Sequence, residues 1–100
     1  MIKISVILPI YNVAPYLDAT FQSVINQSLE DIEIIAVNAG STDDSESIIQ
    51  KYKQQDPRII SLYQENQGQS VASNTALQHA TGQYIYMMDS DDMLSSSDVL

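Results

Sequence analysis

The chain has 100 residues, enough for one small domain, and 44% of them are hydrophobic, which is sufficient for a modest core. Its 13 acidic and 4 basic residues give a net charge of −9, and the scattered basic residues do not form the patch that nucleic-acid binding requires. The absence of cysteine excludes disulfides and thiolate metal sites, and no apolar run approaches the roughly 20 residues of a membrane span.

The first half of the chain has the pattern of two strand–helix units. Residues 3–8 (KISVIL) are almost wholly apolar, which indicates a strand buried on both faces and ended by Pro9. Residues 14–27 carry apolar side chains at helical spacing. Residues 32–38 (IEIIAVN) predict a second strand, and residues 42 to about 54 predict a second helix with acids in its first turn.

The second half repeats this alternation. We predict a strand over residues 58–63, a helix over 68–80 with Gly82 as its C-terminal glycine, and a strand over 84–88. Another helix begins at about residue 95. The order βαβαβαβ with short loops predicts an α/β fold with a mostly parallel sheet and right-handed crossovers.

Four polar segments follow the four predicted strands. Ligands of open parallel sheets bind beyond the carboxyl ends of the strands, so these segments are expected to face one cleft. They are Pro9–Asn12, Asn38–Ser41, Gln64–Gly68 and Asp89–Asp92.

The segment Asp89-Ser90-Asp91-Asp92 places three carboxylates within four residues. Such acids repel one another unless a positive charge lies between them, and Mg²⁺ or Mn²⁺ prefers oxygen ligands of this kind. The same acids could instead cap the helix that follows, and the pattern alone leaves both interpretations open.

Taken singly, the remaining polar segments are weaker signals. The glycine-containing stretch Gln64–Ser70 can hold an anion at a helix N-terminus, but it has neither a Walker A motif nor a G-x-G-x-x-G motif. Pro9–Asn12 offers a proline, an aromatic ring and an amide that suit a nucleobase, and ordinary turn chemistry explains them equally well. His79 lies near the end of a helix and is interpreted as structural.

In this order and spacing, four blocks of the chain closely resemble the N-terminal half of family 2 glycosyltransferases, which have the GT-A fold. The blocks are SVILPIYN, SVINQSLEDIEIIAVNAGSTDDS, ENQGQSVASNTALQHATG and YIYMMDSDDML. The resemblance runs from Lys3 to about Leu94. It implies a Rossmann-like three-layer sandwich, with residues 1–100 as the nucleotide-sugar-binding part that stops before the acceptor-binding half.

The resemblance also implies an activity. Such enzymes transfer a sugar, usually with inversion, from a nucleotide-diphosphate donor to an acceptor hydroxyl, here of a glycan or lipid-linked acceptor in polysaccharide or cell-surface glycan synthesis. By resemblance, Asp89 and Asp91 hold a divalent Mn²⁺ or Mg²⁺, and Asp92 lies near the sugar or acceptor. The implied donor-binding residues are Pro9, Tyr11, Asn12, Asn38, Ala39, Ser73, Asp89 and Ser90.

Two motifs depart from the family pattern, at three positions in all. Relatives typically read V-D-D-G-S where this chain has Val37-Asn38-Ala39-Gly40-Ser41, and A-R-N where it has Ala72-Ser73-Asn74. Ala39 therefore cannot accept a hydrogen bond from the base as a carboxylate does. Three explanations are open. The pocket binds a different nucleotide or recognises the base through backbone groups, the domain has evolved toward weak or absent catalysis, or residues elsewhere in the protein replace the missing contacts.

In the family, the general base that deprotonates the acceptor comes from downstream of the metal motif. We therefore expect the 100-residue segment alone to be inactive. One alternative is a non-catalytic nucleotide-binding or scaffold module. A sugar-phosphate nucleotidyltransferase is disfavoured because Leu8–Tyr16 has neither glycine nor a basic residue. The resemblance implies a cytoplasmic location, with the inner face of the membrane as the alternative for the full-length protein.

Overall fold

The computed structural model describes residues 2–28, 30–65 and 68–88. Strands and helices alternate through this part of the chain as predicted. The elements are β1 (Ile4–Ile10), α1 (Ala14–Ile25), β2 (Ile32–Asn38), α2 (Ser45–Gln55), β3 (Ile59–Tyr63), α3 (Gln69–His79) and β4 (Tyr84–Met87). The acids Asp89–Asp92 and the helix predicted from residue 95 lie outside the described residues.

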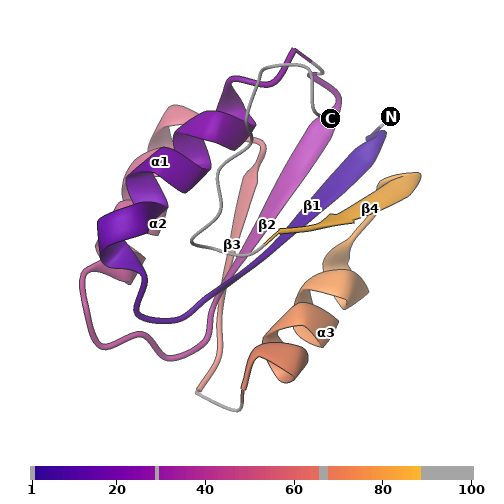
Figure 1. The fold of residues 1–100 in the computed structure, drawn as a ribbon. Helices are drawn as coiled ribbons and strands as arrows, with labels where there is room; N and C mark the ends of the chain where they lie inside the picture. Colours follow the sequence, from indigo (N-terminus) through magenta and orange to yellow (C-terminus); the bar gives the residue numbers. More distant parts are fainter. Residues whose placement is uncertain (1, 29, 66–67, 89–100) are drawn as a thin grey trace.

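The four strands form one parallel sheet in the order β3-β2-β1-β4, which confirms the α/β fold prediction. The chain moves outward from β1 to β3 and then returns past β1 to β4. Right-handed crossovers that run in opposite directions lie on opposite faces of a sheet. Accordingly, α1 and α2 cover one face and α3 covers the other, giving three layers (Figure 1).

The core is divided by the sheet into two clusters, because successive side chains of a strand point to opposite faces. On the side of α1 and α2 the larger cluster includes Val6, Leu8, Ile10, Leu17, Phe21, Val24, Ile34 and Ile49. On the side of α3 the smaller cluster consists of Ile7, Ile35, Val37, Ala39, Ala72 and Ala76. Burial on both faces explains why the first two strands have almost continuous apolar sequences.

The first strand does not end at Pro9, as the sequence predicted, but continues to Ile10. The carbonyl oxygen of Ile10 accepts a hydrogen bond from the N–H of Ala39, so the alternating pattern turns the backbone nitrogen of Pro9 toward β4. In the described residues the pairing of β1 with β4 runs from Ile4 to Ile7. Because the nitrogen of Pro9 faces away from β2, the missing N–H does not interrupt the pairing of β1 with β2.

Two other boundaries differ from prediction for local reasons. The second helix begins at Ser45 rather than Thr42, because the preceding residues form a loop that bonds to the loop after β1. Gly82 does not adopt the left-handed conformation of a C-terminal glycine. A β-carbon at Gly82 would lie 2.7 Å from the backbone nitrogen of Ser5, so glycine is needed there for close approach to β1.

A buried carboxylate fixes the same corner of the molecule. Glu33 on β2 accepts hydrogen bonds from the hydroxyl of Ser5 at 2.5 Å and from the N–H of Thr81 at 2.7 Å. The Ser5 hydroxyl in turn accepts from the N–H of Gly82 at 2.8 Å. The connection from α3 to β4 is therefore joined to the amino ends of β1 and β2.

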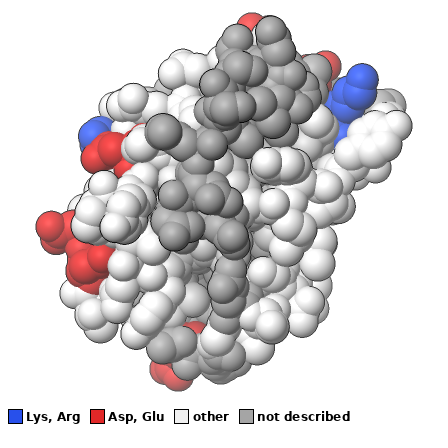
Figure 2. Space-filling model, in the orientation of Figure 1, with Lys and Arg blue, Asp and Glu red and all other residues white. Residues whose placement is uncertain are grey.

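None of the helices found in the described residues has the length and apolar character needed to cross a membrane. On the face drawn in Figure 2, the visible basic side chains stand apart from one another, while acidic side chains lie along the flank beside α1 and α2.

Candidate functional site

The candidate site lies at the carboxyl edge of the sheet, where the strand order reverses between β1 and β4. In open α/β sheets this position forms the ligand crevice, because the neighbouring connections leave on opposite faces. The structure brings together three of the four predicted segments: the loops after β1 and β2 and the start of the loop after β3. Gln64, for example, donates its N–H to the carbonyl oxygen of Asn38 at 2.9 Å. The fourth segment, Asp89–Asp92, lies outside the described residues.

Asn12 joins the first two loops. Its N–H donates to the hydroxyl of Ser41 at 3.0 Å, and its side-chain oxygen accepts from the N–H of Thr42 at 2.8 Å. Asn12 adopts a φ of 51°, in the left-handed region that asparagine tolerates better than most side chains. The asparagine predicted as a donor-binding residue thus also holds the two loops in register.

Asp43 connects the starts of two helices. Its carboxylate accepts from the N–H of Ala14, the first residue of α1, at 3.1 Å, and from the N–H of Ser45, the first residue of α2, at 2.9 Å. Burial raises the pKa of Asp43, but the hydrogen bonds from Ser45 and Ala14 outweigh it, so the pKa lies below its ordinary 3.8. Asp43 stabilises both helix N-termini, in agreement with its interpretation as a helix-start residue.

At the tip of β2 the side chain of Asn38 is buried, and both ends of its amide have partners within the chain. Its Nδ2 donates to Oε1 of Glu46 at 2.9 Å, and its Oδ1 accepts from the N–H of Ser41 at 2.9 Å. The neighbouring Ala39 is also buried and donates its N–H to Ile10 at 2.8 Å. The β2 tip therefore gives this edge a defined shape, because the side-chain polar groups of Asn38 are already hydrogen-bonded within the chain.

The other predicted donor residues differ in exposure. Pro9 is buried in β1, whereas 46% of the surface of Tyr11 is exposed beside it. Ser73 is half-buried on α3. His79 is exposed, and its Nδ1 lies 2.9 Å from the carbonyl oxygen of Thr75. That contact requires the proton on Nδ1 and supports the structural interpretation of this histidine.

In the described ranges 2–28, 30–65 and 68–88, no group of three or more His, Cys, Asp or Glu residues is arranged to hold a metal ion. The predicted metal ligands Asp89 and Asp91, and the neighbouring Ser90 and Asp92, all lie outside these ranges. Their roles remain predictions that rest on the family resemblance.

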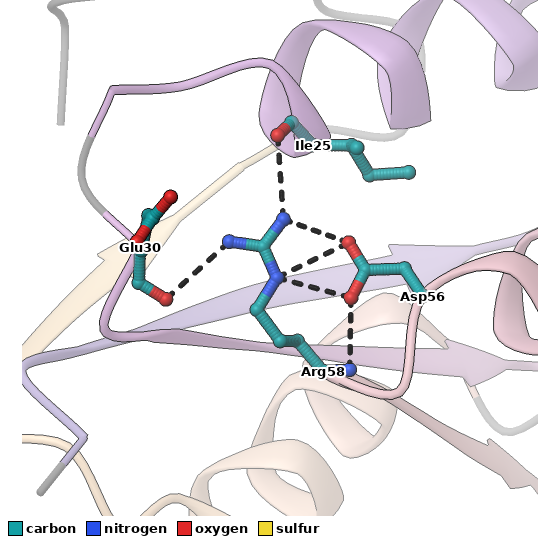
Figure 3. Close-up of polar contacts among 4 residues, drawn as sticks. All are labelled: Ile25, Glu30, Asp56 and Arg58. Atoms are coloured by element: carbon teal, nitrogen blue, oxygen red, sulfur yellow. Dashed lines mark hydrogen bonds and ion pairs between the residues drawn. The ribbon is translucent and has the colours of Figure 1, made fainter.

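A second polar cluster occupies the opposite edge, at the amino ends of the strands. Arg58 contacts the carboxylate of Asp56 through Nε at 3.0 Å and Nη2 at 2.7 Å, and also donates to the carbonyl oxygens of Ile25 and Glu30 (Figure 3). A shallow hollow of about 370 Å³ lies there, lined by Ile25, Gln27, Glu30, Asp56, Pro57 and Arg58. Because Arg58 is committed to these partners, we interpret the cluster as a structural clasp.

Several residues that organise the candidate site lie outside the segments predicted from the sequence. Thr42, Ser45 and Glu46 each bond to a partner on another loop or strand. The run S-T-D-D-S signalled a polar helix start, which is correct for Asp43. Nothing in the spacing indicated that Glu46 bonds back to Asn38, because that contact depends on how the loop folds.

Comparison with known proteins identifies the family. The family model described as "Glycosyl transferase family 2" matches residues 5–100. Glycosyltransferase GlyA of Streptococcus pneumoniae is 46% identical over 92 residues, which are 92% of this chain and 13% of that protein. Minor teichoic acid biosynthesis protein GgaB of Bacillus subtilis is 45% identical over an alignment of 94 positions that covers 91% of this chain and 10% of that protein. The chain thus spans only a small part of either relative.

Solved structures agree with this result. The mannosyltransferase PcManGT from Pyrobaculum calidifontis, in complex with GDP-Man and Mn²⁺, matches 95% of this chain and 29% of its own at a TM-score of 0.89 and 28% identity. S. aureus TarS 1–349 in complex with UDP-GlcNAc matches 92% of this chain and 27% of its own at a TM-score of 0.86 and 30% identity. The chain belongs to the family 2 glycosyltransferases.

Proposed function

We propose that the protein transfers a sugar, with inversion, from a nucleotide-diphosphate donor to the hydroxyl of a glycan or lipid-linked acceptor. The observation that carries the proposal is the match of 95% of the chain, at 28% identity, to a mannosyltransferase whose structure contains GDP-Man and Mn²⁺. The relative named for minor teichoic acid biosynthesis supports a role in polysaccharide or cell-surface glycan synthesis. We place this activity in the cytoplasm or at the inner face of the membrane.

In this proposal the nucleoside lies against Pro9, Tyr11 and Asn12, over the β2 tip. The cross-loop hydrogen bonds of Asn12 support it, since they hold the two loops in place before a ligand arrives. Asn38 and Ala39 would pack against the nucleoside by shape complementarity. Further donor contacts are assigned to Ser73, Asp89 and Ser90.

The carboxylates of Asp89 and Asp91 would hold a Mn²⁺ or Mg²⁺ ion, because both ions prefer hard oxygen ligands. When bound, such an ion neutralises charge that develops on the leaving nucleoside diphosphate. The position of β4 supports the assignment, because β4 ends at Met87 beside β1 at the carboxyl edge of the sheet and the acids come directly after it in the sequence. Asp92 is assigned to the sugar or the acceptor, and the general base to a residue beyond residue 100.

The alternative function, a non-catalytic nucleotide-binding or scaffold module, is favoured by one observation. The β2 tip carries Asn38 and Ala39, which leaves it without a carboxylate. Losing a hydrogen bond to a charged group costs roughly 1.5–3 kcal/mol, which weakens binding about ten- to a hundredfold. That loss weakens donor binding without by itself preventing transfer.

Calorimetry of the full-length protein separates the proposed function from a scaffold that binds no nucleotide. We expect at least one of UDP, GDP, ADP, CDP and dTDP to bind more tightly with Mn²⁺ than without it. Asp91→Ala should abolish the gain from Mn²⁺, whereas Asp92→Ala should preserve it, because a diphosphate without a sugar does not reach Asp92. Absence of binding across the panel would favour the scaffold, and unchanged Mn²⁺ dependence in Asp91→Ala would refute the metal assignment.

A further inference from the structure

The side chains of Asn38 and Glu46 form a partly buried contact at the edge of the candidate site. Asn38 is 1% exposed, donates to Glu46 at 2.9 Å and accepts from the N–H of Ser41 at 2.9 Å. An amide can do both, whereas an ionised carboxylate only accepts. Position 38 therefore requires a side chain that donates on one side and accepts on the other.

Glu46 is itself held in place by α2 and β3. Its second carboxylate oxygen accepts from Nε2 of Gln50 at 2.8 Å, and the same nitrogen donates to the hydroxyl of Ser61 on β3 at 3.1 Å. Turning the Glu46 carboxylate away from Asn38 would disturb these contacts as well. The acceptor that faces Asn38 is thus fixed by the fold around it.

The contact also continues toward the first loop. Ser41, whose N–H donates to Asn38, accepts from the N–H of Asn12 through its hydroxyl at 3.0 Å. A continuous path of hydrogen bonds therefore runs from Glu46 on α2 through Asn38 and Ser41 to Asn12. Disturbing Glu46 should loosen the loop after β2 at the surface where we place the nucleoside.

We propose that Asn38 and Glu46 form a matched pair that positions the loop after β2, with Glu46 as a positioning residue that admits an amide and excludes a carboxylate at position 38. The proposal rests on the proposed function, because the loop matters for binding only where a nucleotide occupies this edge. It assigns a role to Glu46, which lies outside the expected donor pocket.

The exclusion follows from electrostatics. A carboxylate at position 38 would face the Glu46 carboxylate at about the distance of the present 2.9 Å hydrogen bond. Two negative charges so close together in a partly buried position disfavour the doubly ionised state. If glutamine replaced Glu46, its amide could donate to a carboxylate at 38, which would restore the bond with its direction reversed.

The test is a double-mutant cycle in the full-length protein with Asn38→Asp, Glu46→Gln and both changes together. Titration calorimetry with UDP and with GDP, each with Mn²⁺, gives the affinity, and thermal unfolding gives a readout that needs no ligand. Glu46→Ala tests the loss of the acceptor. Asp44→Asn is the charge-matched control, because Asp44 is exposed at the start of α2 and forms no side-chain cap there.

We expect Glu46→Ala to weaken nucleotide binding by roughly three- to tenfold, while Glu46→Gln retains a side-chain acceptor and stays within about twofold of wild type. Asn38→Asp should weaken binding by about tenfold or more, and the double variant should recover most of that loss. Unfolding midpoints should follow the same order. Asp44→Asn should match wild type in binding.

Equal losses in Asn38→Asp and in the double variant would overturn the pairing, and so would a Glu46→Ala variant that binds as well as Asp44→Asn. A recovery seen in unfolding but absent from binding would refute the positioning role and keep the contact as purely structural. If the wild-type protein binds no nucleotide, the proposed function and the positioning role both fail. The unfolding cycle would still decide whether the pair exists.

Discussion

At the β2 tip, the side-chain amide of Asn38 bonds to Glu46 and to the backbone of Ser41, while Ala39 packs into the core on the side of α3. The sequence predicted that this tip lies at the candidate site and lacks charge, because the strand pattern and the residue identities are local properties. It could not predict that Glu46 approaches Asn38. That contact crosses a turn whose geometry depends on bonds to Asn12, on another strand–helix connection.

Replacing Gly82 with alanine should destabilise the fold. An alanine there would place its β-carbon 2.7 Å from the nitrogen and hydroxyl of Ser5, and the backbone of a central strand cannot readily move. We expect Gly82→Ala to lower the free energy of unfolding by about 1–3 kcal/mol, the usual cost of overpacking. Urea unfolding of the variant and the wild type measures this change, with the dependence of the unfolding free energy on urea concentration held equal for the two proteins.

Gly68 provides the comparison. It has a φ of 94° with nothing near the position of a β-carbon, so only backbone strain opposes substitution. Alanine and asparagine should both be costly at Gly68, because its φ of 94° and ψ of 163° lie in a region that essentially only glycine adopts, whereas at Gly82 the cost arises from the contact with Ser5. A Gly82→Ala variant as stable as the wild type would contradict the close approach to Ser5.

At the scale of whole elements, the alternation of strands and helices was predictable because apolar periodicity is strong in each segment. The ends of the elements were less predictable, since they depend on neighbours. The first strand passes through Pro9 because the nitrogen of Pro9 faces away from β2, and α2 starts at Ser45 because Asp43 bonds to it and to α1. The clasp at Arg58 was also not foreseen, although it joins the end of α1 to the turn before β3.

The Arg58 clasp predicts how stability depends on pH. Hydrogen bonds from Arg58 lower the pKa of Asp56 below its ordinary 3.8, although burial opposes them. A carboxyl group whose pKa is lowered by folding stabilises the folded state fully at pH values above its pKa in the unfolded chain. This stabilisation is lost as the pH falls through the pKa that the group has in the folded state. When the pH falls from about 5 to about 2, the Asp56→Asn variant should therefore lose less unfolding free energy than the wild type.

Urea unfolding at a series of pH values measures this loss. Asp31→Asn serves as the control, because Asp31 is exposed at the same edge of the sheet, before β2. The wild type and the control should lose stability in parallel on acidification, and Asp56→Asn should lose less. If Asp56→Asn loses as much as the wild type, the ion pair with Arg58 does not contribute to stability as inferred.

For the whole molecule, the sheet order β3-β2-β1-β4 brings the loops after β1 and β2 to the edge beside the end of β4. The sequence predicted this convergence, because the carboxyl ends of parallel strands share one edge. It could not specify which side chains there bond to one another within the chain, and the structure shows that Asn12 and Asn38 both do. The central claim is that this edge binds the nucleotide of a sugar donor.

A crystal structure of the full-length protein with Mn²⁺ and the nucleotide diphosphate that binds best in calorimetry tests this claim most directly. We expect the nucleoside to lie against Pro9–Asn12 and the loop after β2, with Mn²⁺ on Asp91 and the Asn38–Glu46 contact intact. A nucleotide bound at another surface, such as the hollow beside Arg58, or Mn²⁺ held by other residues, would contradict it.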